Sequence, residues 1–331
     1  KGLEKGKPQV SFSSNVSFDV VGRLPEFQKT YAQGSGGVFS ATSGTSWGPK
    51  ISELPNDATY GGSNANSDYA KEYGVHQGKY YVPQRAAAGL DPWVTPQAYD
   101  NAKDFFDTGI TWSNSLNVAQ MLDKSSYSIS LGNTHQDGII SSTGMDRYNV
   151  KVSADTKLTN NWSSGFTANY ITTSIDKAVT SGNGLLRTVY AAPPSYDLAG
   201  IPSHVDGNLY AQNSFRGSFD NAYWAMENNK FTEDTNRFFG NVYASYQTDF
   251  GTTNHKLNAK YMVGVDAYTT HYVDSYGYGS NTGGGRGQIE NYGWTNATYN
   301  SLLTINYDWH INEDWGLNAV VGNEIIQSNR K

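Results

Sequence analysis

The stretch from 147 to 158 alternates regularly between apolar and polar residues. Its apolar set contains Tyr148, Val150, Val152 and Leu158, and its charged set contains Arg147, Lys151 and Asp155. Because successive side chains of a β-strand point to opposite faces, this period of two predicts a strand with one apolar and one charged face. A soluble β-sandwich would bury the apolar face, and a membrane barrel would turn it toward lipid. This strand alone leaves both arrangements open.

The same alternation recurs along the chain and predicts nine strands. They cover 9–21, 109–122, 126–137, 147–158, 162–175, 236–250, 256–272, 298–310 and 315–327. The only helical signal is one turn within Asn101–Asp107. The sequence therefore predicts an all-β fold.

The connections between the predicted strands alternate in length. The longer ones are 22–108, 138–146, 176–235 and 276–288, and the shorter ones lie around Asp123 and at 159–161, 251–255 and 311–314. In an antiparallel meander, alternate connections lie at the same end of the sheet. Short turns at one end and long loops at the other are typical of outer-membrane barrels. We therefore predict an antiparallel meander that forms part of a large transmembrane β-barrel over residues 1–331, with extracellular loops at 23–108 and 176–235 and short periplasmic turns.

Aromatic residues gather near both ends of the predicted strands. Those beside the short turns are Trp162, Phe250, Trp309 and Trp315, and those toward the long loops are Tyr148, Tyr170, Phe238, Tyr268 and Tyr299. Ten residues of strand span roughly 33 Å, or roughly 25 Å of height at a tilt of about 40°, which matches the lipid-facing band of a barrel. The spacing favours aromatic girdles, although such residues are also good strand formers. It assigns Tyr148, Val150, Val152 and Leu158 to lipid.

The polar faces of the strands would then line the lumen. We expect Arg147, Lys151, Asp155 and Asp266 to face water or a plug there. Their mixed signs indicate no strong ion selectivity.

Composition narrows the class of protein further. Charged residues make up 16% of the 331 residues, the net charge is −6, and cysteine is absent. There is no disulfide framework and no basic stripe, so nucleic acid is not an expected partner. The sequence contains no run of 18 apolar residues, so it predicts no transmembrane helix.

The sequence offers no catalytic constellation. None of its six histidines has metal-ligand spacing, and the glycine-rich run Gly283–Gly287 lacks the Lys-Ser/Thr of a phosphate-binding loop. Gly44-Thr45-Ser46-Trp47-Gly48 has the spacing G-x-S-x-G, but we do not interpret it as a nucleophile elbow. We therefore expect no enzyme activity, no catalytic residues, no cofactor and no metal site.

The long loops are rich in aromatic residues. The candidates for contacting a ligand or partner are Trp47, Tyr60, Tyr80, Tyr81, Trp93, Tyr210 and Trp224. Such side chains serve substrate binding and protein–protein interfaces alike, and they also pack loops that need a core of their own. All three roles stay open.

Three segments of the sequence stand out as recognisable: QGSGGVFSATSGTSWGPK (33–50), YDNAKDFFDTGITWSNSLNVA (99–119) and SYSISLGNTHQDGIISSTGMDRYNVKVSADTKL (126–158). Together, in this order and spacing, they resemble the SusC/RagA family of TonB-dependent outer-membrane transporters of Bacteroidetes. The resemblance covers nearly the whole chain and weakens in the loops after Asp176. It implies a fragment from the N-terminal part of a plugged 22-stranded barrel, without the plug and the later strands.

The resemblance also implies a function. Oligosaccharides or peptides would be imported through the bacterial outer membrane with a SusD-like surface lipoprotein, driven by TonB acting on the plug. Transporter–lipoprotein pairs could form a higher oligomer. The alternatives are a soluble all-β carbohydrate-binding domain and a plug-less outer-membrane pore or adhesin. The odd number of strands suggests a part of a longer protein, because single-chain bacterial barrels have an even number.

Overall fold

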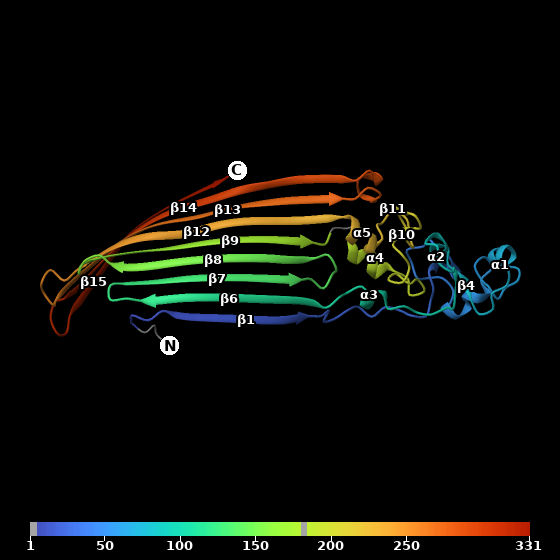
Figure 1. Ribbon diagram of the computed structural model, residues 1–331, viewed down its shortest axis with the longest axis horizontal. Coiled ribbons are helices and arrows are strands. Elements are labelled where there is room, and N and C mark those ends of the chain that lie inside the picture. The colour runs from blue at the N-terminus through green and yellow to red at the C-terminus, as the bar shows by residue number, and fades with distance from the viewer. Residues whose placement is uncertain (1–4, 180–183) are drawn as a thin grey trace.

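The computed structural model describes residues 5–179 and 184–331, and one large antiparallel sheet dominates it (Figure 1). The strands follow one another in chain order, each paired with its neighbours in sequence. They are β1 (Gln9–Asp19), β6 (Gly109–Met121), β7 (Ser125–Asp137), β8 (Gly144–Lys157), β9 (Trp162–Lys177), β12 (Lys230–Thr248), β13 (His255–Tyr276), β14 (Gln288–His310) and β15 (Gly316–Arg330). The predicted nine-stranded meander is confirmed, with β1 and β15 at its edges.

Three strands extend furthest beyond the ends that the sequence predicts. β12 starts at Lys230 rather than at 236, β13 runs to Tyr276, and β14 starts at Gln288 rather than at 298. The predicted loop 176–235 is therefore too long, since its last six residues belong to β12. The apolar alternation stops before these strand ends, which is why the pattern did not include them.

The two ends of the sheet differ as the connection lengths predict. At what we call the hairpin end, tight turns at 122–124, 158–161, 249–254 and 311–315 join neighbouring strands (Figure 1). Local side-chain acceptors hold these turns: Thr159 Oγ1 accepts from the Trp162 N–H at 3.0 Å, and Asn312 Oδ1 accepts from the Trp315 N–H at 2.9 Å. Every long connection lies at the opposite end, which we call the loop end.

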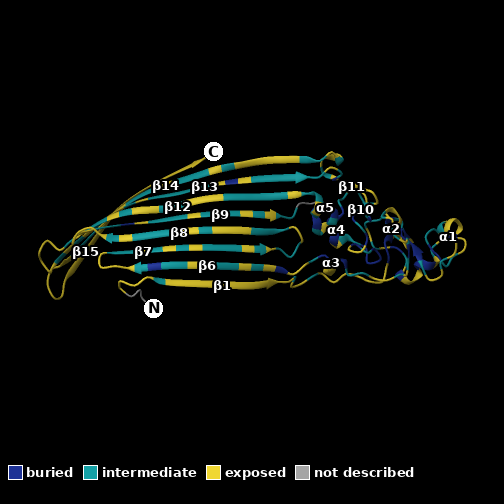
Figure 2. Ribbon diagram, in the orientation of Figure 1, coloured by how far each residue is buried: buried dark blue, intermediate teal, exposed yellow. Residues whose placement is uncertain are grey.

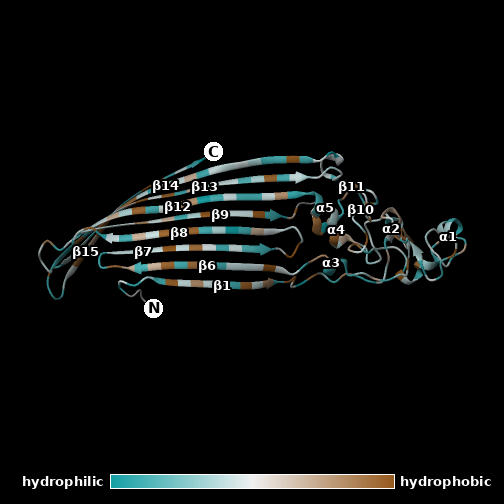
Figure 3. Cartoon of the chain, in the orientation of Figure 1, coloured by the Kyte–Doolittle hydropathy of each residue, from teal (hydrophilic) through white to brown (hydrophobic). Residues whose placement is uncertain are grey.

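The strand register gathers the apolar residues on one side of the sheet, the apolar face. One row runs through six adjacent strands as Phe12, Leu116, Leu131, Val150, Tyr170 and Phe238. These side chains are exposed, with 69% of Phe12 and 44% of Phe238 accessible. Figure 3 shows the underlying alternation as brown and teal bands along the strands. The apolar face is therefore continuous and uncovered.

The other side of the sheet, the polar face, carries Ser, Thr, Asn and charged residues. Arg147, Lys151 and Asp155 share it with Asp266, as the predicted alternation requires. Cross-strand bonds link its members: the Tyr243 hydroxyl donates to Asp155 at 2.6 Å, and the Arg237 guanidinium donates to both carboxylate oxygens of Asp266 at 2.8 and 2.5 Å. Tyr268 also lies on the polar face, opposite Asn296. The prediction that Tyr268 belongs to the aromatic girdle is therefore wrong.

The two longest connections fold together into a separate unit at the loop end. We call residues 20–108 and 184–229 the loop body. It contains β2 (Gly34–Ser35), β3 (Val38–Phe39), η1 (Ile51–Asn56), α1 (Asp68–Tyr73), β4 (Tyr80–Tyr81), α2 (Pro83–Ala87), β5 (Trp93–Val94), α3 (Asn101–Asp104), α4 (Leu185–Ala191), β10 (His204–Val205), β11 (Asn208–Gln212) and α5 (Ala222–Asn228); η2 (Thr282–Gly285) lies in the β13–β14 loop. α3 falls within the single helical turn that the sequence predicts; the other helices were not predicted.

The hydrophobic core lies in the loop body rather than against the sheet. Leu54 from the first connection packs in one cluster with Val189, Leu198 and Phe215 from the second, and at most 1% of each is exposed. Figure 2 shows this as dark blue ribbon concentrated in the loop body, while the strands are teal and yellow. Among the described residues, no helix is both long and apolar enough to span a membrane.

Candidate functional site

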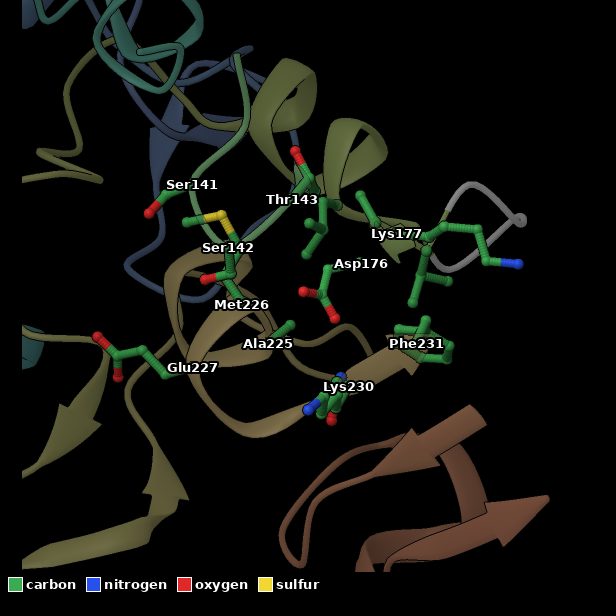
Figure 4. A pocket seen from close by; sticks show the side chains of 14 residues that line it. Ser141, Ser142, Thr143, Asp176, Lys177, Ala225, Met226, Glu227, Lys230 and Phe231 are labelled. Atoms are coloured by element: carbon green, nitrogen blue, oxygen red, sulfur yellow. The ribbon is translucent and has the colours of Figure 1, made fainter. Parts of the chain in front are cut away.

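A cavity of about 320 Å³ lies where the loop body meets the loop end of the sheet. Its side chains come from the 141–143 segment, the end of β9, α5 and the start of β12 (Figure 4). Met226, Leu185 and Phe231 supply apolar surface, and the charged residues are Asp176, Lys177, Glu227 and Lys230. This mixed lining suits a ligand that carries both apolar and charged groups.

A second cavity of about 400 Å³ adjoins the first and shares Ser141, Ser142, Thr143 and Asp176 with it. Its lining is acidic and contains Asp107, Asp137 and Asp146 together with His135. The His135 Nδ1 atom lies 2.8 Å from Asp146 Oδ1, and its Nε2 atom lies 3.5 Å from Asp137 Oδ1. These two carboxylates hold the imidazole ring in place.

Five aromatic side chains gather on the polar face at the loop end, and we call Phe231, Tyr272, Tyr276, Tyr292 and Trp294 the inner aromatic cluster. Tyr272 stacks on Tyr292 with ring centroids 5.0 Å apart and lies 5.2 Å from Trp294. Phe231 meets Tyr276 edge to face at 5.1 Å. Phe231 also lines the 320 Å³ cavity, so the cluster continues that cavity along the sheet.

Charged groups of the protein border the inner aromatic cluster. Lys177 Nζ lies 4.6 Å from the centre of the Tyr272 ring and 3.2 Å from Glu233 Oε2. The Arg330 guanidinium lies 4.8 Å from the Trp294 ring centre. The Tyr292 hydroxyl donates to Asp274 Oδ2 at 3.2 Å. Rings that hold cations in this way offer their π-faces to positive charge.

Four of the seven loop aromatics predicted as ligand or partner contacts are buried. Tyr80, Tyr81, Trp93 and Trp224 are each at most 7% exposed and pack within the loop body. The Tyr80 hydroxyl donates to the Ser195 carbonyl at 2.8 Å, and burial raises the pKa of this phenol. Trp224 Nε1 donates to the Leu209 carbonyl at 2.9 Å. In this structure these four side chains serve packing, because almost none of their surface is available to a ligand.

The remaining three loop aromatics keep accessible surface. Trp47 is 71% exposed and Tyr210 is 59% exposed. Tyr60 is half-buried and stacks on Tyr69 with ring centroids 5.3 Å apart, and the partial burial raises its pKa. Trp47 and Tyr210 are thus the two that present most of a ring to the outside.

Sequence reasoning missed the inner aromatic cluster, although the sequence contains a signal for it. In β13 the apolar positions up to Ala267 are odd-numbered apart from Met262, whereas the aromatic residues beyond them, Tyr268, Tyr272 and Tyr276, are even-numbered. In β14, Tyr292 and Trp294 are likewise out of phase with Tyr299. A change of phase within one unbroken strand means that the aromatic residues change face.

Within 5–179 and 184–331, no three His, Cys, Asp or Glu side chains converge closely enough to hold a metal ion.

No family model matches the sequence, and no curated protein does either. Solved structures are similar in fold. Two chains, titled as the RagAB peptide importer in the closed-closed and open-open states, align with all of this chain at TM-scores of 0.64 and 0.63 and 14% identity. A third, titled as the RagAB peptide transporter, aligns with 71% of the chain at a TM-score of 0.55 and 18% identity. This chain covers 36%, 36% and 27% of those chains. At these identities the likeness establishes a shared fold.

Proposed function

We propose that this chain is part of a TonB-dependent importer of the bacterial outer membrane, which takes up peptides or oligosaccharides with a SusD-like lipoprotein. The observation that carries the proposal is the continuous, uncovered apolar face. Soluble monomers rarely expose more than a few hundred Å² of contiguous apolar surface. A nine-stranded sheet that exposes one entire apolar side is suited to lipid.

The dimensions of the apolar face fit a membrane. Tyr299 and Trp309 both lie on it in β14, ten residues apart. Ten residues of strand span roughly 33 Å, and a tilt of about 40° gives a height of roughly 25 Å, the lipid-facing band of an outer-membrane barrel. The apolar face would contact lipid through Tyr148, Val150, Val152 and Leu158, and the polar face would line the lumen.

The loop body supports a role in capture rather than passive leakage. It is built from the two longest connections of the sheet, at the end where an outer-membrane barrel meets the outside of the cell. The exposed Trp47 and Tyr210 rings suit a partner lipoprotein or cargo. TonB coupling through a plug comes from the family resemblance, and the similar structures are titled as peptide importers.

Fractionation and uptake together test the proposal. The intact protein should remain in the outer-membrane pellet after carbonate washing and should need detergent for extraction. Cells that express it should accumulate labelled peptides or oligosaccharides, and removal of TonB should abolish that accumulation. Recovery in the aqueous fraction would instead favour the soluble carbohydrate-binding domain, and uptake that is independent of TonB would favour a plug-less pore.

A further inference from the structure

We propose that the inner aromatic cluster, and Tyr292 in particular, binds the lysine or arginine side chain of a peptide. This inference rests on the proposed import function and specifies the cargo chemistry that the polar face selects.

The first observation is the change of face along β13 and β14. Between the girdle positions, the aromatic residues of these two strands lie on the apolar face, as Tyr261 and Tyr299 do. Beyond them, the same side of the sheet carries Asn236, Thr269 and Thr295, which form one register row. The rings have moved to the opposite side, which faces the interior. Strand propensity alone does not choose a face, so the placement needs another cause.

The second observation is the charge around the cluster. Glu233, Asp274 and Glu290 supply three carboxylates on the polar face, whereas Lys177 and Arg330 supply two cations. The adjoining cavity adds Asp176 and Glu227 against one further cation, Lys230. The region is therefore net negative by two charges, and a cationic group complements it.

The third observation concerns the rings themselves. Lys177 and Arg330 already lie over Tyr272 and Trp294, so a neutral sugar would have to displace a cation to stack on either ring. Tyr292 is the most accessible ring of the cluster, with 43% of its surface exposed. It sits between two carboxylates: its hydroxyl donates to Asp274, and Glu290 lies two residues away on the same face. A ring flanked by carboxylates is the chemistry that recognises ammonium and guanidinium groups.

The test uses the full-length protein in detergent micelles and three probes: a fluorescent heptapeptide with two lysines, its counterpart with two glutamates, and the neutral glycan maltoheptaose. The lysine peptide should bind most tightly, and more weakly as salt rises. Tyr292→Ala should weaken its binding about tenfold, whereas Tyr292→Phe should stay within about twofold because the ring face remains.

Two further variants separate recognition from folding. Asp274→Asn combined with Glu290→Gln keeps the shape and removes two charges, so it should also reduce lysine-peptide affinity about tenfold. Ile289→Ser changes an exposed residue of the same strand on the opposite face and should leave binding unchanged. Equal affinity for the lysine and glutamate peptides, unchanged lysine-peptide binding in both site variants, or Tyr292-dependent binding of maltoheptaose would each overturn the inference.

Cell-based uptake distinguishes this failure from failure of the proposed function. If accumulation depends on TonB but does not favour the lysine peptide, the result supports the proposed import function and contradicts the cationic specificity. If the purified protein binds the lysine peptide through Tyr292 but cells never accumulate cargo, the result supports the binding site and contradicts the import function.

Discussion

At the scale of single residues, the two faces of β8 make opposite predictions for adjacent positions. Val152 lies on the apolar face and Ser153 on the polar face, where its hydroxyl is 2.8 Å from that of Ser128. Val152→Arg should destabilise the folded protein by about 2–4 kcal/mol, the cost of a cation near the bilayer midplane, and Ser153→Arg by less than about 1 kcal/mol. Urea unfolding in lipid vesicles measures both. Similar losses at both positions would contradict the assignment of the faces.

The loop aromatics give a second prediction at this scale. Trp224 is fully buried in the loop body, so Trp224→Ala should cost about 3–5 kcal/mol there, whereas Trp47→Ala removes an exposed ring and should cost little. Limited proteolysis should cut the Trp224→Ala loop body faster and leave the strands intact. Unchanged proteolysis of that variant would mean that Trp224 does not hold the loop body together.

The sequence predicts which face a strand residue occupies, but it does not predict which loop residues are buried. Alternation assigns a strand residue to a face because its geometry is local. The burial of Tyr80 depends on Ser195, 115 positions away, which its hydroxyl contacts. No pattern near position 80 contains that information, so buried and exposed loop aromatics look alike in the sequence.

At the scale of elements, one carboxylate links the β13–β14 loop to the loop body. Asp220 accepts from Gln212 Nε2 at 2.6 Å, from Ser280 Oγ at 2.6 Å, and from the Asn281 N–H and Nδ2 at 2.7 and 2.9 Å. Asp220→Ala removes all four bonds, each to a charged acceptor, so hydrogen exchange in 277–287 should become faster while β13 and β14 keep their protection.

Asp249 provides the matched control for that experiment. It accepts from the Gly251 N–H at 2.9 Å within the turn 249–254 at the hairpin end. Asp249→Ala should therefore accelerate exchange in that turn alone. If Asp220→Ala leaves exchange in 277–287 unchanged, the carboxylate does not hold this loop.

The lengths of the elements explain which of them the sequence predicts. The strands of the sheet repeat their alternation over eleven residues or more, which is a strong signal. The helices of the loop body have four to seven residues and are too short to be stable alone. They form where the fold supplies partners: the Ser67 hydroxyl caps α1 by accepting from the Ala70 N–H, and the Asn221 side chain caps α5. Contacts within the loop body, rather than local helix propensity, therefore stabilise these helices.

At the scale of the whole molecule, the sheet and the loop body are stabilised in different ways. Backbone hydrogen bonds between paired strands hold the sheet, and its apolar face stays uncovered by the rest of the protein. The loop body, by contrast, has a hydrophobic core of its own. That core is shared: the buried Gln33 side chain from the first connection donates to the Phe215 carbonyl of the second at 2.8 Å, and Asn101 donates to the Tyr196 carbonyl at 2.9 Å. Neither connection therefore has a complete core without the other.

This division predicts the effect of removing one half of the loop body. Replacing 184–229 with a short Gly-Ser linker between β9 and β12 removes Val189, Leu198, Phe215 and Trp224 from the core. The buried surfaces of Leu54 and Tyr80 would then face water, so the connection 20–108 should lose its structure and become sensitive to protease. The sheet should still assemble, because its register involves only strand residues, and heat-modifiable mobility on gels would report its folding. A connection 20–108 that stays resistant to protease after the replacement would show that it folds independently, and the shared core would then contribute little to its stability.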